Sequence, residues 1–181
     1  LLGLRKRFKR ASRLPGWAKP AVGGLVTGII AVATISLVNT PGINGGGYET
    51  LRRALGGDLR VKVMLVLCVA KLLATTFSYS SGGAGGIFAP VLFIGAMLGG
   101  SFGWVDVFLF NHPNRNTAAF ALVGMGALFS GAIRAPMTSV LIIVEMTSGY
   151  ELILPLMIAN MSAYIIARRF RPSTIYEALL E

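Results

Sequence analysis

The segment with the clearest chemical meaning is a glycine-rich turn that runs into an apolar stretch, at residues 80–90 (SSGGAGGIFAP). A helix that begins here leaves backbone N–H groups without intrahelical partners and presents the positive end of its dipole, and both features favour an anion. Pro90 suits the first helical turn, where its missing N–H costs nothing. The GK[ST] ending of a phosphate loop is absent, so the segment predicts an anion site that does not take a nucleotide.

Other side chains that could do chemistry are scattered and form no catalytic set. Glu145 lies inside an apolar run, where an acid is by default a candidate functional group, but we expect it to reach an interface or to pair with Arg134. Lys71, inside another apolar run, is expected to face a water-filled cavity or to extend its amino group to the membrane surface. His112 in a polar loop and Cys68 in an apolar helix offer no catalytic pair, and the sequence predicts neither a metal nor a cofactor.

The composition of the chain indicates a membrane protein. Of 181 residues, 54% are hydrophobic and 13% are charged, whereas a soluble domain carries roughly 25% charged residues. So few charges cannot cover a globule with a wetted surface, which excludes a soluble enzyme and a disordered chain. The single cysteine excludes a disulfide scaffold. The chain begins with Leu1, and we expect that part of the protein precedes it.

The basic residues are concentrated near the two ends of the chain. Seven of the 17 lie in residues 1–19, and three more lie in residues 168–171. Apolar stretches adjoin both clusters, so we interpret them as cytoplasmic flanks and not as a nucleic-acid surface. Residues 1–19 are therefore predicted to be a basic cytoplasmic linker, and both ends are predicted to lie in the cytoplasm. The following apolar stretch is too long for a signal peptide.

The elements that must position the turn are apolar helices, several of them short. Apolar runs of about 8, 16 and 17 residues are shorter than a comfortable membrane span. Broken helices survive in lipid where protein or a water-filled cavity satisfies their freed backbone groups, a pattern typical of transporters. We predict an all-α integral membrane fold with tilted, broken and re-entrant helices, with apolar segments at 21–38, 61–79, 87–105, 117–133, 137–144 and 152–167 and a short final helix within 172–181.

Four motifs resemble, in the same order, those of the CLC family of chloride channels and proton/chloride antiporters. They are GGGY at 45–48, GGIFAP at 85–90, the long stretch at 124–157 and STIYEALL at 173–180. The resemblance covers essentially residues 18–181. It implies selective chloride transport across a membrane, with chloride as the transported ligand and no cofactor.

The resemblance also implies a set of anion-binding residues. In the family, chloride is held by backbone amides at the start of the helix after the glycine turn and by a tyrosine hydroxyl on the last membrane helix. Carried onto this chain, these are Ile87, Phe88 and Tyr176, supported by the turn at Gly85 and Gly86. From spacing alone, a tyrosine near a helix start at a membrane edge favours an interfacial anchor, and the resemblance reverses that interpretation.

Some motifs of the family are absent from the chain. The family's membrane domain consists of two inverted halves, and neither GSGIP nor GKEGP of the first half is present. Residues 20–181 are therefore expected to be the C-terminal half of a CLC-type membrane domain, one inverted-repeat half, with the N-terminal half as its partner. Whether the parent is a channel or an antiporter stays open. The resemblance further implies a homodimer through residues 136–167 and a multi-pass location in the cell (inner) membrane.

Two readings from other classes of protein compete with anion transport. An intramembrane serine protease needs a GxSG serine and a facing histidine, but the sequence Tyr79-Ser80-Ser81-Gly82 lacks the leading glycine and the single histidine lies in a loop. A membrane scaffold without a transport role would leave the broken helices without a purpose. We therefore predict a transport protein and not an enzyme.

Overall fold

The structure, a computed structural model, describes residues 18–180 apart from residues 41, 84, 111–116 and 172–173. These residues form helices and connecting turns, and no strand is found among them. In chain order the elements are α2 (Ala18–Val38), α3 (Tyr48–Leu55), α4 (Val61–Ser80), α5 (Phe88–Phe110), α6 (Thr117–Ile133), α7 (Pro136–Thr147), the 3₁₀ turn η1 (Tyr150–Leu152), α8 (Ile153–Phe170) and α9 (Ile175–Leu180). The predicted all-α fold is confirmed.

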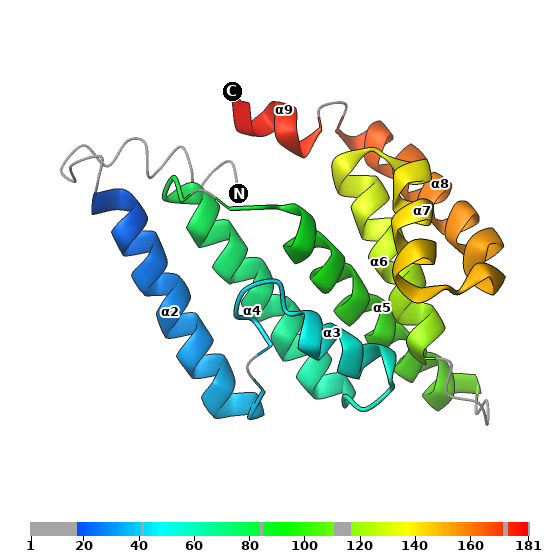
Figure 1. Cartoon of the computed structure of the whole chain (residues 1–181), viewed down its shortest axis with the longest axis horizontal. Helices are drawn as coiled ribbons and strands as arrows, with labels where there is room; N and C mark the ends of the chain where they lie inside the picture. Colours follow the sequence, from blue (N-terminus) through cyan, green and yellow to red (C-terminus); the bar gives the residue numbers. More distant parts are fainter. Residues whose placement is uncertain (1–17, 41, 84, 111–116, 172–173, 181) are drawn as a thin grey trace.

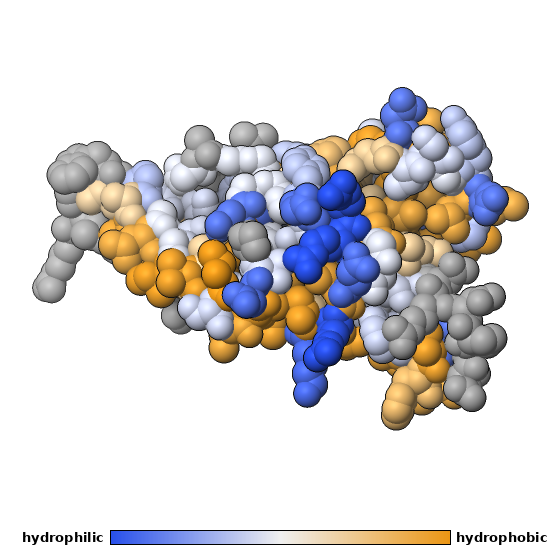
Figure 2. Space-filling view, turned by 60° about the horizontal axis from the view of Figure 1, so that its bottom comes forward, coloured by the Kyte–Doolittle hydropathy of each residue, from blue (hydrophilic) through white to orange (hydrophobic). Residues whose placement is uncertain are grey.

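Long apolar helices occur together with shorter ones, as suits a membrane protein with broken spans, and large hydrophobic areas lie on the surface (Figure 2). Four helical stretches are long and apolar enough to cross a bilayer: α2, α4, α5 and the continuous stretch of η1 and α8. In contrast, α6 has 17 residues and α7 has 12. At a rise of about 1.5 Å per residue they reach roughly 25 and 18 Å, less than the hydrocarbon thickness of about 30 Å. The prediction of interrupted membrane helices is confirmed.

The helix boundaries follow the predicted apolar runs, with one larger difference at the end of α5. The sequence predicted an end at residue 105, but the helix continues through Asp106 to Phe110. Asp106 is only half-buried, so its carboxyl does not have to be removed from polar surroundings for the helix to continue. The predicted polar loop at 111–116 lies outside the described residues.

The helices lie side by side, with α5 in the middle of the row (Figure 1). α2 packs on α4 at one side of α5, and α6, α7 and α8 pack on its other side. The start of α2, the end of α4 and α9 lie along one edge of the molecule, and α3 lies toward the opposite edge (Figure 1). The start of α2 and the end of α8 share that first edge, as an even number of crossings requires.

Glycines let α5 and α6 approach each other closely. A Cβ on Gly99 would lie 2.2 Å from the carbonyl oxygen of Phe120, and a Cβ on Gly124 would lie 2.6 Å from both the carbonyl oxygen of Gly95 and the Cα of Gly99. In lipid no hydrophobic driving force brings helices together, so they associate through close packing, which small residues at the crossing allow. Close packing of two helices is therefore the role of glycine at these positions.

Polar contacts fasten both sides of the break between α6 and α7 to α8. Asn160 of α8 is fully buried, and its Nδ2 donates to the carbonyl oxygen of Pro136 at 3.3 Å. The hydroxyl of Ser130 on α6 donates to the backbone carbonyl oxygen of Asn160 at 2.7 Å. These two bonds hold α6 and α7 against α8 at the point where the chain changes direction.

Candidate functional site

The turn between α4 and α5 changes direction at Gly82. This residue has a φ of +87°, a left-handed conformation that glycine adopts at little cost. Gly85 and Gly86 do not have positive φ values. Of the described glycines in this turn, Gly82 is therefore the one in the left-handed conformation, and the supporting role of Gly85 and Gly86 stays a prediction. The hydroxyl of Tyr79, at the end of α4, donates to the carbonyl of Gly85 and ties the turn to that helix.

Open space is the feature that distinguishes Gly85 and Gly86. A Cβ built on either residue meets no atom within 4 Å, and both residues are exposed. A ligand can therefore approach the backbone from this side.

The two residues at the start of α5 differ in exposure, because Phe88 remains 37% exposed and Ile87 does not. Ile87 is buried, and its carbonyl accepts the N–H of Val91 at 3.1 Å, the first bond of the helix. The ring of Phe88 packs edge-to-face on Phe129 of α6, with centroids 5.0 Å apart. Neither the Ile87 nor the Phe88 amide donates a hydrogen bond to another described residue. The chemistry available at this helix start is therefore that of N–H donors.

Tyr176 is carried by α9, whose start is fixed by a capping box. The Thr174 amide donates to the Glu177 carboxylate at 2.9 Å, and the Glu177 amide donates to the Thr174 hydroxyl at 3.1 Å. Ile175 packs against the core, whereas the Tyr176 side chain remains 46% exposed. α9 and the turn after α4 lie along the same edge of the molecule (Figure 1).

Lys71 occupies a place that the sequence did not predict. It neither lines a water-filled space nor extends to the surface, because only 3% of the residue is exposed. Its Nζ donates to the carbonyl oxygens of Ile43 at 3.0 Å and Gly45 at 2.6 Å. Nζ also lies 5.4 Å from the centre of the Phe93 ring on α5. Backbone oxygens of a distant loop satisfy this side chain, and no residue-type pattern marks such oxygens.

Arg134 does not pair with Glu145, contrary to one of the two alternatives considered. Its guanidinium donates to the carbonyl oxygens of Ala167, at 2.8 Å, and Arg171 at the end of α8. The last carbonyls of a helix are free and carry the negative end of its dipole, so they attract a cation. Glu145 is exposed, in agreement with the other alternative, that it reaches an interface.

The serine motif considered for an intramembrane protease is already committed to packing and to a backbone hydrogen bond. The hydroxyl of Ser81 is committed to the Ser78 carbonyl at 2.8 Å, and both Ser80 and Ser81 are buried. No group of three or more His, Cys, Asp or Glu side chains that could hold a metal occurs among the described residues. Cys68 is buried in packing, as expected. His112 lies outside the described residues.

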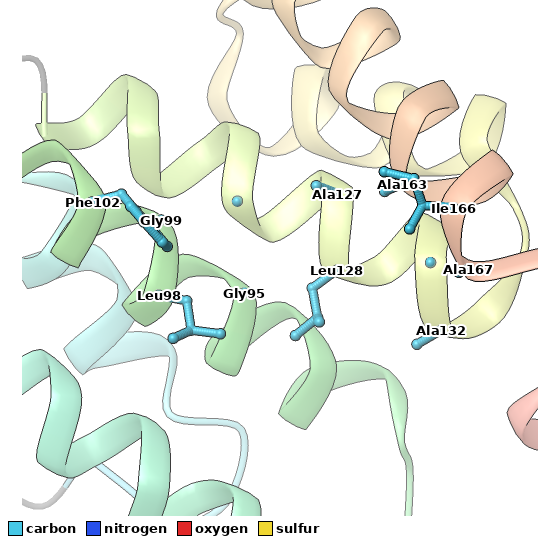
Figure 3. Close-up of a pocket in the computed structure, with 12 residues that line it drawn as sticks. Gly95, Leu98, Gly99, Phe102, Ala127, Leu128, Ala132, Ala163, Ile166 and Ala167 are labelled. Atoms are coloured by element: carbon cyan, nitrogen blue, oxygen red, sulfur yellow. The ribbon is translucent and has the colours of Figure 1, made fainter. Parts of the chain in front are cut away.

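A groove of about 560 Å³ lies between α5, α6 and α8 (Figure 3). Its walls are glycine and apolar side chains, including Leu98, Phe102, Leu128 and Ile166. These side chains offer hydrocarbon contacts and no hydrogen-bond donor. The groove therefore lacks the N–H donors that the start of α5 could offer to an anion.

The comparison with known families agrees with this chemistry. The sequence profile described as "Voltage gated chloride channel" matches residues 1–168. The match includes Ile87 and Phe88 and ends before α9, so Tyr176 lies outside it. Together with the four apolar helices, it indicates a multi-pass integral membrane protein of chloride transport. Because the match extends over most of the sequence, the chain belongs to the voltage-gated chloride channel family.

Proposed function

We propose that residues 20–181 are the C-terminal half of a CLC-type membrane domain and supply about half of a chloride pathway. The observation that supports this most strongly is the geometry of the α5 start. The side chains of Ile87 and Phe88 pack against the protein, while the backbone side at Gly85 and Gly86 faces open space. An anion that approaches from this side meets N–H groups.

The proposed site holds chloride through dipoles and a hydroxyl, without a full positive charge. The helix contributes an effective charge of roughly +0.5 at its N-terminus. The Tyr176 hydroxyl is the proposed second donor, reached from the cytoplasmic side. A site of this kind compensates the hydration that the ion loses, yet it binds weakly enough to release the ion, as conduction requires.

A half-site predicts that the chain does not work alone. Donors that face lipid without their partner half are costly to bury. We expect liposomes that contain only residues 1–181 to show no chloride flux, and liposomes with the chain co-expressed with an N-terminal CLC half to show flux. Strong flux from the chain alone would refute the half-site. Proton movement measured in the same liposomes separates an antiporter from a channel.

We further propose that both ends of the chain lie in the cytoplasm, with residues 1–19 as a basic linker and the protein in the cell (inner) membrane. Cysteines placed at Ser12 and Ser173, which both lie outside the described residues, should react with impermeant reagents from the same side. Labelling from opposite sides would rule this topology out.

Homodimerisation through residues 136–167 is also proposed. α7 and α8 expose apolar side chains to their surroundings, among them Met137 (60% exposed) and Leu154 (71%). Ile153 packs partly against the core and is a poor place to probe the interface. Met137→Trp and Leu154→Trp should therefore weaken the cross-linked dimer. Leu25→Trp, on the equally apolar surface of α2, is the control and should leave the dimer intact.

A further inference from the structure

A buried amino group near the middle of the molecule has no part in the proposed anion site. Lys71 lies near the middle of α4, and its polar partners are the carbonyls of Ile43 and Gly45. The acidic side chains of the described residues do not pair with it. Lys71 is only 3% exposed, and burying an amino group in an apolar helix is costly unless its N–H groups donate hydrogen bonds.

The donors of Lys71 are used to hold the loop that precedes α3. This loop, residues 42–47, enters the protein interior at Gly42 and Ile43, which are both buried. Irregular backbone at such a place leaves carbonyls that no helix or sheet satisfies. By donating to two of them, Lys71 fastens the loop to α4.

The same loop packs on α5 through Phe93. A Cβ on Gly47 would lie 2.7 Å from the Phe93 ring, so glycine lets the loop backbone rest on that ring. Phe93 is 1% exposed and has the Lys71 amino group over its face. It follows Phe88 by five residues, or about 7.5 Å along the helix. Lys71, the loop and the first turns of α5 therefore form one continuous contact.

We propose that Lys71 is a positioning residue for the start of α5. By fastening the 42–47 loop over Phe93, it fixes where α5 begins and hence where the Ile87 and Phe88 amides lie. This proposal rests on the proposed function, because it assigns those amides to the chloride path. Lys71 acts through the loop and through Phe93 and does not itself touch the anion.

The test compares three variants of the chain, each assembled with the N-terminal half. Lys71→Met keeps the length of the side chain and removes its donors, Lys71→Arg keeps donors, and Lys62→Met changes an exposed lysine on the same helix. Chloride affinity is measured by titration calorimetry, and amide hydrogen exchange is followed at residues 42–47 and 87–93. We expect Lys71→Met to weaken chloride binding about tenfold or more and to speed exchange in both segments. Lys71→Arg should stay within about threefold of the parent affinity, and Lys62→Met should change neither measurement.

Two results would overturn the proposal. Weaker chloride binding without faster exchange would mean that Lys71 acts through its charge and not by positioning. Faster exchange at 42–47 with unchanged affinity would mean that the lysine serves the loop alone. If Lys71→Met yields no folded protein, Lys71→Gln takes its place and should give an intermediate loss of affinity with faster exchange in both segments.

The proposed function fails separately from the Lys71 proposal. If Gly86→Val and Tyr176→Ala both leave chloride affinity unchanged, the anion site itself is wrong, whatever Lys71→Met does. If those two variants lose affinity and Lys71→Met does not, the anion site stands and the role of Lys71 is refuted.

Discussion

Two glycine-rich loops precede helices in this chain, and the glycines just before the two helices have opposite surroundings. In the loop before α3, a Cβ on Gly47 would lie 2.7 Å from Phe93 and 2.8 Å from the Gly42 carbonyl, and the residue has a φ of +72°. In the loop before α5, a Cβ on Gly85 or Gly86 would meet nothing within 4 Å. Position 47 needs glycine because other atoms fill the space that a side chain would take, whereas the space beside positions 85 and 86 is empty.

The two loops also differ in whether the protein itself binds their polar backbone groups. The first loop presents carbonyl oxygens, and Lys71 of the protein itself occupies them. The second presents amides at the start of α5, and the space in front of its glycines is open. A motif of several glycines before a helix therefore has two meanings, close packing or access for a ligand. The neighbours of each glycine decide between the two meanings.

The largest effect is expected from Gly47→Val. A β-branched residue cannot adopt the left-handed backbone without strain and would overlap the Phe93 ring, at a combined cost of about 2–6 kcal/mol. We expect loss of monodisperse protein in size-exclusion chromatography and a lower temperature of thermal aggregation. Gly85→Val is the matched control and should leave both measurements near those of the parent. Equal losses for the two variants would break the comparison.

Gly86→Val tests the empty space in the second loop. The added side chain fits without a clash, so the fold should survive, but it stands where the anion approaches the backbone. We expect chloride affinity to fall by about tenfold or more, which corresponds to about 1.4 kcal/mol. Gly24→Val on α2, where a Cβ also meets nothing within 4 Å, should change neither stability nor affinity. Unchanged chloride binding by Gly86→Val would remove the proposed meaning of the second loop.

Tyr176→Ala tests whether the chloride proposed to bind at the second loop also contacts α9. A hydrogen bond to a charged group contributes about 1.5–3 kcal/mol, so affinity should fall roughly 10- to 150-fold. Tyr176→Phe loses the donor but keeps the ring that walls the path, and should lose less. Tyr150→Ala, another exposed tyrosine, is the control for a nonspecific effect. An alanine variant with parental affinity and transport would refute the role of Tyr176.

The smallest effect is expected from Ile87→Val. Removing one buried methylene costs about 0.5–1.5 kcal/mol of stability. The proposed contact with chloride is made by the backbone amide, which the substitution keeps. Chloride titration should therefore give the parental affinity, and a large loss would show that the side chain takes part in binding.

Most of the helices could be predicted because particular residue types mark where they begin and end. Gly, Pro and charged residues interrupt the apolar runs where α2, α4 and α6 end, and the Thr174–Glu177 capping box marks the start of α9. The extension of α5 past residue 105 could not be predicted from the apolar run, because that run ends at Asp106 and the helix does not. Near the last turns of a helix, such an acid can keep its carboxyl in polar surroundings.

The partners of buried cations could not be predicted for a different reason. Lys71 and Arg134 both bind backbone carbonyls, which every residue carries, so the sequence gives no sign of which carbonyls come near. The candidate site has the same property. Ile87 and Phe88 have apolar side chains, and their selection depended on the resemblance of the surrounding motif and not on their own chemistry.

The contact between Asn160 and Pro136 has a consequence for how the protein is made. The ribosome synthesises α6 and α7 before α8, so both short helices emerge before the side chain that fastens α7 to α8. Until α8 arrives, two helices too short to span the bilayer lack the hydrogen bonds that hold them against a longer one. In contrast, α2 is long and apolar enough to cross a bilayer, and only its Gly23 and Thr34 are buried against the protein. We therefore expect α2 to enter the bilayer as it is synthesised, and α6, α7 and α8 to enter as a group.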